Sequence, residues 1–242
     1  MDVVDVRGLL GLLLADGNLM PYRAPAGGFI QLTLTAGANE SAFLAEKAEE
    51  VRRYIPTKAR IVPYKTRPRA SGASSEILRF RVSSNRLRPI YNMLYPSGER
   101  RITQSVLDLL GARAAAWLWA EGARPRKDGG AYLARVGSSL DEAAMVCRWL
   151  SMLTGGESSI DDNLVRPRLY FQPPEASKVR QALRPYAPTT RQHLFQENVI
   201  DLVSIRSART ELLTRQRSPE PEGIGGESLS GDQALGAAED LP

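Results

Sequence analysis

The sequence predicts an α+β protein of two similar halves, each with the order helix, two strands, helix, two strands, helix. Two short apolar runs, 9–17 and 114–122, each end in a small residue, an acid and a glycine. A glycine pair, an alternating strand and an amphipathic helix follow each run, and short segments ending in proline, 87–96 and 179–188, close the two halves. This duplication predicts two saddle-shaped antiparallel sheets joined at a central pair of helices.

The two apolar runs are expected to form buried helices, because they are apolar nearly all round. The glycine after each acid can adopt the left-handed conformation that ends a helix. Gly11 in the first run and the alanines 114–116 in the second are small enough for two helix backbones to approach closely. Such packing places Asp16 and Glu121 side by side.

Two carboxylates a few ångströms apart repel each other unless one is protonated or a cation bridges them. Hard divalent cations, Mg²⁺ or Mn²⁺, prefer oxygen ligands of this kind. The pair Asp16 and Glu121 therefore predicts a metal-dependent site for phosphodiester hydrolysis, with both side chains as metal ligands and catalytic groups.

Alternation of apolar and polar residues predicts the strands that follow. They are expected at 29–35, 61–66 and 77–83 in the first half, and at 131–136, around Leu164 and at 168–172 in the second. The segments from each acid to the next glycine pair are expected to be loops. Amphipathic helices are expected near 40–54 and 141–153, the second with Ser139 as its N-cap.

The outward faces of both sheets are predicted to be polar and basic, because side chains alternate along a strand. Arginine and glutamine can recognise guanine and adenine in the major groove, and other basic groups contact phosphates. The DNA-binding candidates are Gln31, Thr33, Thr35, Lys65, Arg67, Arg69, Arg79, Arg81, Arg124, Arg126, Lys127, Arg135, Arg166, Arg168, Tyr170 and Gln172. A sheet face that is only exposed to solvent carries the same residue types, so this pattern alone does not distinguish a DNA-binding face from an ordinary surface.

Charge favours a polyanionic partner. The last 25 residues hold six acidic and no basic residues, so residues 1–217 carry 32 basic against 21 acidic side chains. An excess of eleven positive charges suits nucleic acid. Acidic residues flank the first apolar run, which argues against a signal peptide and a membrane partner. The single cysteine, Cys147, excludes an internal disulfide, so we expect an intracellular protein of the cytoplasm, nucleoid or organelle matrix.

Residues 9–17, Leu-Leu-Gly-Leu-Leu-Leu-Ala-Asp-Gly, resemble the motif of the LAGLIDADG homing endonucleases. Residues 114–122 are similar to a more degenerate second motif, with Glu121 as the acid and with Trp117 and Trp119 as in the aromatic-rich second motifs of single-chain members. The resemblance covers about residues 5–195. It implies the pseudo-twofold fold of that family and a monomeric endonuclease that makes a staggered double-strand break in a long, asymmetric DNA target during intron homing.

The resemblance also implies further site residues. Backbone carbonyls of Ala15 and Ala120 would add metal ligands, and a basic residue would assist each acid. The internal repeat matches these basic positions to Arg101, with Arg100 as its neighbour, and to His193, as catalytic groups. The implied subdomains are 1–104 and 105–200, followed by a helical extension at 201–217 and a disordered acidic tail at 218–242.

Other functions stay open at this point. The same fold could serve a non-cleaving nucleic-acid binder, either an intron RNA maturase with the host intron RNA as partner or a DNA-binding regulator. The longer side chain of Glu121 is compatible with an active nuclease, a nickase or an inactive remnant. A basic enzyme acting on unrelated small substrates would need a pocket that the sequence does not locate. With one histidine and no serine near it in sequence, a Ser-His-Asp set has no support.

Overall fold

The computed structural model describes residues 3–24, 27–66, 76–162 and 166–196. The first half contains α1 (Val3–Ala15), β1 (Asn18–Ala24), β2 (Gly27–Ala36), η1 (Ala38–Glu40), α2 (Ser41–Tyr54), β3 (Val62–Lys65), β4 (Glu76–Ser84), η2 (Asn85–Leu87) and α3 (Arg88–Leu94). A short helix, α4 (Gln104–Asp108), precedes the second half. This half contains α5 (Ala112–Gly122), β5 (Ala123–Pro125), β6 (Ala131–Leu133), α6 (Leu140–Thr154), β7 (Ser159–Asp161), β8 (Arg168–Phe171), α7 (Pro173–Leu183), η3 (Arg184–Tyr186) and η4 (Thr189–Phe195).

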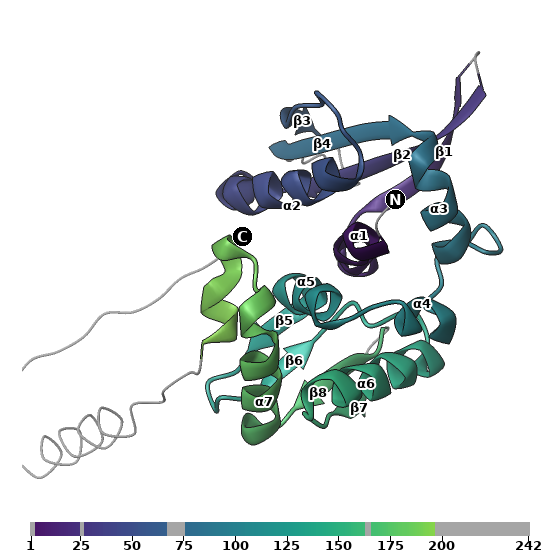
Figure 1. Ribbon diagram of the computed structural model, residues 1–242. Coiled ribbons are helices and arrows are strands. Elements are labelled where there is room, and N and C mark those ends of the chain that lie inside the picture. The colour runs from purple at the N-terminus through teal and green to yellow at the C-terminus, as the bar shows by residue number, and fades with distance from the viewer. Residues whose placement is uncertain (1–2, 25–26, 67–75, 163–165, 197–242) are drawn as a thin grey trace, which may run out of the picture. The chain divides into compact units, whose positions relative to one another are not determined.

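The predicted fold class is confirmed. Each half carries one antiparallel four-stranded sheet, with the order β1-β2-β4-β3 in the first and β5-β6-β8-β7 in the second. The helices α1 and α5 lie side by side between the two sheets (Figure 1). The boundary predicted at 104/105 falls inside α4, and one apolar core continues through both halves.

Strand alternation in the first sheet is as predicted. Ile30, Leu32 and Leu34 on β2 are at most 1% exposed, and Phe80 and Val82 on β4 are also buried. The polar residues between them face the opposite side, with Thr33 paired to Arg81 and Thr35 to Arg79 in register. The sheet therefore has an apolar face against the helices and a polar, basic face away from them.

Two segments expected to be loops are strands. β1 pairs with β2 from Asn18 to Ala24, and β5 pairs with β6 from Ala123 to Pro125. Pro21 obscures the first of these strands in the sequence, since proline lacks the N–H that a central strand needs. β1 is an edge strand, where this loss is tolerated.

Helix ends follow the sequence more closely, except that Gly122 lies within α5 and does not have the left-handed conformation expected of it. Ser139 caps α6 as predicted, because its Oγ accepts a hydrogen bond of 3.2 Å from the backbone N–H of Glu142. Gly155 ends the same helix in the left-handed region, with φ of 68°. The strand expected around Leu164, the candidates Arg67 and Arg69, and the predicted extension and tail at 201–242 lie outside the described residues.

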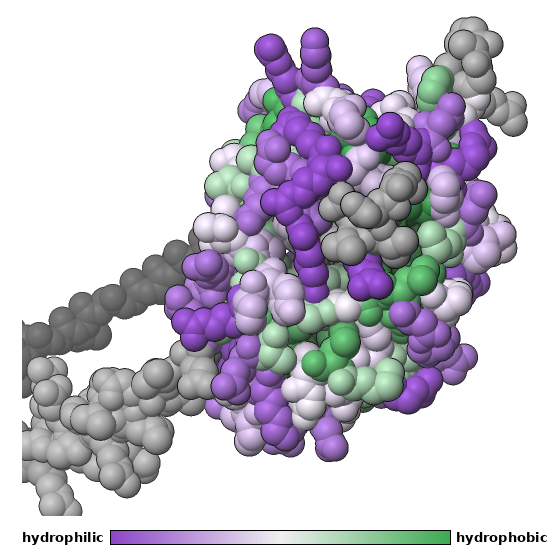
Figure 2. All heavy atoms as spheres, in the orientation of Figure 1, coloured by the Kyte–Doolittle hydropathy of each residue, from purple (hydrophilic) through white to green (hydrophobic). Residues whose placement is uncertain are grey.

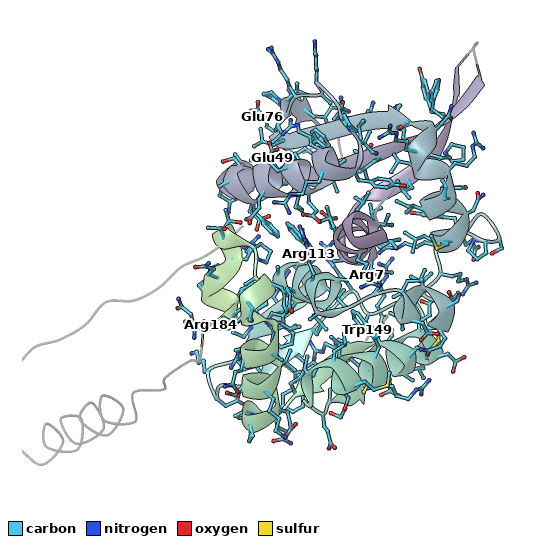
Figure 3. The ribbon with its side chains drawn as sticks, in the orientation of Figure 1. Arg7, Glu49, Glu76, Arg113, Trp149 and Arg184 are labelled. Carbon is cyan, nitrogen blue, oxygen red and sulfur yellow. The ribbon has the colours of Figure 1, made fainter. Side chains whose placement is uncertain are left out.

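The contact between the central helices is close. A Cβ added at Gly11 would overlap the Cα of Ala114 and would lie 2.6 Å from its Cβ and 2.7 Å from its carbonyl oxygen. Ala114, Ala115 and Ala116 are completely buried. Further along, Arg113 at the start of α5 is directed towards α2, where its Nη2 lies 2.7 Å from Oε2 of Glu50 (Figure 3). Within the described residues, none of the helices has both the length and the hydropathy to span a membrane.

Candidate functional site

The two motif acids lie at the ends of the central helices. Asp16 directly follows α1, and its backbone N–H still donates a 2.8 Å hydrogen bond to the carbonyl of Leu12. Gly17 then turns the chain with φ of 95°, a conformation that suits glycine. Glu121 lies in the last turn of α5. Their side chains are 21% and 8% exposed, so both carboxylates are largely shielded from water.

One lysine joins the two acids. The Nζ atom of Lys47, on α2, lies 2.8 Å from Oδ2 of Asp16 and 2.5 Å from Oε1 of Glu121. The side chain of Lys47 is only 2% exposed. The carboxylates of the two motifs therefore meet at a single buried ammonium group, which forms an ion pair with each of them.

The sequence analysis missed Lys47, although the helix pattern contains a signal. Lys47 lies three residues after buried Leu44, on the apolar face of α2, where a charged residue needs a partner. In α6 the matching position, three residues after buried Ala143, holds Val146, which is 1% exposed. The ring of Phe43 also faces the ammonium, with the ring centre 4.9 Å from Nζ. A lysine thus occupies a core position that the other half fills with valine.

Arg135 also binds the first acid, which corrects its predicted place on the outward sheet face. β6 ends at Leu133, and Arg135 adopts a left-handed conformation with φ of 66°. Its Nη1 lies 2.9 Å from the carbonyl oxygen of Ala15 and 3.1 Å from Oδ1 of Asp16. Arg135 therefore places a positive charge of the second half at the end of α1 in the first half.

Arg100, rather than Arg101, reaches the motif helix. Its Nη2 donates to the carbonyl oxygens of Leu13, at 2.6 Å, and Leu14 in the last turn of α1. These carbonyls have no partner within the helix, so Arg100 caps its end. Arg101 is exposed and pairs with Glu99 instead. The catalytic role of Arg101 stays a prediction.

The charges around Asp16 fix its ionised form. Burial alone would raise the pKa of Asp16, but the charge and hydrogen bond of Lys47, the backbone N–H of Gly17 and the charge of Arg135 together hold this pKa below its ordinary value of 3.8. Burial lowers the pKa of Arg100 from its ordinary value. The carboxylate of Asp16 is thus anionic at neutral pH, with two cationic partners.

A cavity of about 900 Å³ opens beside the end of α1. Its lining residues are Leu14, Ala15, Arg100, Ile102, Ala134, Arg135, Gly137, Ser138, Glu142, Arg166, Pro167 and Arg168. The single acid in this lining, Glu142, accepts hydrogen bonds from the backbone N–H groups of Ile102 and Ser138. Four arginines therefore line this space, although the guanidinium of Arg168 is paired with Asp161 and that of Arg100 is bonded to the carbonyls of α1.

The first sheet presents most of its predicted DNA contacts on one face. Gln31 donates a 3.2 Å hydrogen bond to Oγ of Ser83 across this face, and the guanidinium of Arg79 lies 3.9 Å from the ring centre of Tyr64. Lys65 differs, because it pairs in register with Glu76 and alternation places both on the face opposite Arg79. In the view of Figure 2, hydrophilic side chains gather over this half of the chain.

The second sheet carries a cluster of aromatic and basic groups. The ring centres of Tyr132 and Tyr170 lie 5.0 Å apart. The guanidinium carbon of Arg126 lies 5.2 Å from each ring centre, and that of Arg168 lies 3.9 Å from the ring centre of Tyr132. Tyr132, which the sequence analysis missed, is one place from buried Leu133, so alternation turns it outwards. These ring contacts hold two arginines on the outward face, together with the ion pairs Arg126–Asp128 and Arg168–Asp161.

The remaining candidates lie at the edges of this sheet. Arg124 donates to the carbonyls of Glu121, at 3.3 Å, and Ala123, at 2.9 Å. Lys127 and Gln172 are exposed, the latter just before α7, and the exposed Arg166 lines the cavity. His193 lies in η4 and is exposed. The predicted catalytic role of His193 and the DNA contacts of this set stay predictions.

The donor atoms suit a hard divalent ion only in part. No group of three or more His, Cys, Asp or Glu side chains comes together within the described parts of the chain. A divalent ion would therefore depend on Asp16, Glu121 and the carbonyls of Ala15 and Ala120, all of them oxygen donors of the preferred kind. The Ala15 carbonyl is already bonded to Arg135, and Lys47 lies between the carboxylates.

Comparisons with known proteins agree with this architecture. The structure resembles the homing endonuclease I-WcaI bound to its DNA recognition sequence, with a TM-score of 0.66 and 13% identity over 82% of this chain and 88% of that chain. It also resembles I-DmoI in complex with DNA and Ca, with a TM-score of 0.50 and 15% identity over 76% of this chain and 91% of that chain. No curated protein matches the sequence significantly.

The family assignment comes from the sequence match. Residues 7–178, more than half of the 242-residue chain, match the model of the LAGLIDADG DNA endonuclease family. This range contains both acids, Lys47 and both sheets, and the two similar structures share the fold. The protein belongs to the LAGLIDADG DNA endonuclease family.

Proposed function

We propose that the protein is a homing endonuclease that cuts both strands of a long, asymmetric DNA site as a monomer. The observation that carries this proposal is the convergence of Asp16 and Glu121 on one point, each from its own motif helix and each within hydrogen-bond distance of Lys47. One acid from each half suits one cut in each strand. The description of I-WcaI as bound to its DNA recognition sequence supports the same partner.

The two outward sheet faces would bind the duplex. Arg79 and Arg81 extend from the first sheet, and Arg126 and Arg168 from the second. A planar guanidinium can bind guanine with two hydrogen bonds, and its charge also suits phosphate. Because ring contacts with the tyrosines and ion pairs with Asp128 and Asp161 already hold Arg126 and Arg168, these side chains lose less freedom when DNA binds.

Asp16, Glu121 and the carbonyl of Ala120 would hold a divalent ion, Mg²⁺ or Mn²⁺, with the Ala15 carbonyl available once Arg135 moves to a phosphate. When bound, such an ion supplies positive charge that stabilises the developing charge on the phosphate. Arg100 and Arg135 add fixed positive charge at the end of α1 and attract the DNA backbone to the cavity. Arg100 is better placed for this role than Arg101.

Cleavage of a randomised plasmid library tests the proposal. The purified protein is incubated with the library in Mg²⁺, in Mn²⁺ and in EDTA, and linear products are sequenced. We expect cleavage at one long site in Mg²⁺ or Mn²⁺ and none in EDTA. Asp16→Asn, which keeps the shape of the side chain and removes its charge, should abolish cleavage but retain DNA binding. Lys178→Met on α7 changes an exposed lysine and serves as the control.

A second function is favoured by one specific observation. Lys47 and Arg135 already pair with the oxygens of Asp16, so this carboxylate is balanced without a metal ion. A non-cleaving DNA-binding protein on the same fold would have such a site. It predicts tight, sequence-specific DNA binding with no linear product in any divalent ion, and that result would contradict the nuclease proposal. The intron RNA considered above as a partner finds no support in the comparisons.

A further inference from the structure

Burial of the charged Lys47 side chain costs free energy, so its partners must compensate for this cost. A charged side chain is rarely fully buried unless it is paired. At the corresponding position of α6 the buried residue is Val146, so in the other half an apolar side chain fills this place. The contacts that distinguish Lys47 from a valine are those of its ammonium group with Asp16 and Glu121.

We propose that Lys47 is a built-in competitor of the divalent ion, which keeps the carboxylate pair satisfied and closed to metal in the free protein. The ammonium group lies where the two acids share a cation. A divalent ion that binds both acids must displace it. The inference rests on the proposed function only in treating Asp16 and Glu121 as the metal ligands.

The charge balance supports this competition. Two carboxylates pair directly with two cations, Lys47 and Arg135, and Arg100 lies at the same helix end, so no negative charge is left unbalanced. A divalent ion added beside an ammonium group in a poorly solvated site meets strong repulsion. Phosphates of bound DNA would supply the missing negative charge. The free protein should therefore bind divalent ions weakly, and metal should enter together with DNA.

Replacement of Lys47 by an apolar side chain reverses this balance. In Lys47→Met the two carboxylates face each other without a shared cation, and their repulsion destabilises the metal-free fold. A divalent ion that binds this pair then stabilises the folded state by mass action. The stability of the wild type should therefore be independent of divalent ions, whereas the stability of Lys47→Met should increase when they are added.

Terbium luminescence and thermal unfolding measure both effects without DNA. Trp119 lies two residues before Glu121 on α5 and can sensitise Tb³⁺ bound at the pair. We expect Lys47→Met to bind Tb³⁺ at least tenfold more tightly than the wild type, to melt at a lower temperature in EDTA, and to recover in Ca²⁺. The wild type should melt at the same temperature in EDTA and in Ca²⁺, and so should Lys178→Met, which loses a surface ion pair with Glu175 far from the two acids in sequence.

Lys47→Gln provides a second variant if Lys47→Met does not fold. The amide can donate a hydrogen bond to a carboxylate but carries no charge, so the same gain in Tb³⁺ affinity is expected. Adding Asp16→Asn to either variant should remove that gain, because one ligand loses its charge. Unchanged Tb³⁺ affinity in both lysine variants, or a wild-type melting temperature that rises in Ca²⁺ as much as that of Lys47→Met, would overturn the proposal.

Cleavage assays separate this inference from the proposed function. If the wild type cuts DNA in Mg²⁺ while the lysine variants bind Tb³⁺ no more tightly, the inference fails and the nuclease function stands. If the variants gain Tb³⁺ affinity but no form of the protein cuts DNA, the inference stands and the nuclease function fails.

Discussion

The contact of Gly11 with Ala114 gives a sharp test of how the central helices place the acids. In Gly11→Ala, the new Cβ would overlap the Cα of Ala114 and approach its Cβ and carbonyl oxygen to 2.6 and 2.7 Å. Overpacking of this kind costs about 1–3 kcal/mol or more, and backbone atoms cannot rotate away. Alanine regains about 1 kcal/mol of helix propensity over glycine.

The overlap with three atoms places the packing cost at the upper end of that range, so we expect a net loss of about 2 kcal/mol in the free energy of unfolding. For a domain of this size such a loss lowers the melting temperature by about 4–8 °C. Urea unfolding followed by tryptophan fluorescence measures the loss, because Trp117 and Trp119 lie on α5. Separation of the helices should also reduce Tb³⁺ binding in the Lys47→Met background.

Ala114→Gly, combined with Gly11→Ala, tests whether the contact is the cause. The double variant removes the Cβ of Ala114 but leaves its Cα and carbonyl oxygen in place, so only part of the lost stability should return. Full recovery would show that side chains alone set the helix separation. A Gly11→Ala protein as stable as the wild type would refute the close-packing argument altogether.

Three further predictions concern single contacts. Because the pKa of Asp16 is lowered from 3.8, its pairing stabilises the fold fully well above that pH and is lost as the pH falls through the lowered value; metal-free urea unfolding should therefore show an advantage of wild type over Asp16→Asn at pH 7 that shrinks below pH 3.8. Arg135 has φ of 66°, so Arg135→Gly should be about 1 kcal/mol more stable than Arg135→Ala in the same assay, and equal stabilities would contradict the strain. Glu46 accepts hydrogen bonds from the backbone N–H groups of Thr189 and Thr190, at 2.6 and 3.0 Å, so Glu46→Ala should accelerate amide hydrogen exchange in this segment roughly tenfold, whereas unchanged exchange would show that the contact contributes little.

The sequence allowed the repeat, the sheet faces and the meeting of the two acids to be predicted because each depends on local pattern. Alternation in β2 and β4 assigns faces residue by residue, and the small residues at Gly11 and Ala114 indicate close helices. The duplicated motif made even the distant contact of the two helices predictable, because each copy carries small residues and a terminal acid.

The missed features depend on partners that are remote in the chain. Lys47 meets Glu121 across 74 positions, and Arg135 meets Asp16 across 119. Alternation alone would have kept Arg135 on the sheet face, but the chain turns into the left-handed region once β6 has ended. The lysine on the apolar face of α2 indicated in the sequence that a buried partner had to exist, but it did not identify that partner.

The last described segment of the second half, η4, binds both halves: the indole N–H of Trp119 on α5 donates to the carbonyl of Leu194, and further contacts reach the first half. Arg191 pairs with Glu40 and stacks on Phe43, while Thr189 and Thr190 bond to Glu46. A recombinant that joins residues 1–104 of this chain to the second half of a relative would lose these partners along with η4. Any exchange of halves should therefore keep η4 together with α2, the helix that carries Phe43 and Glu46.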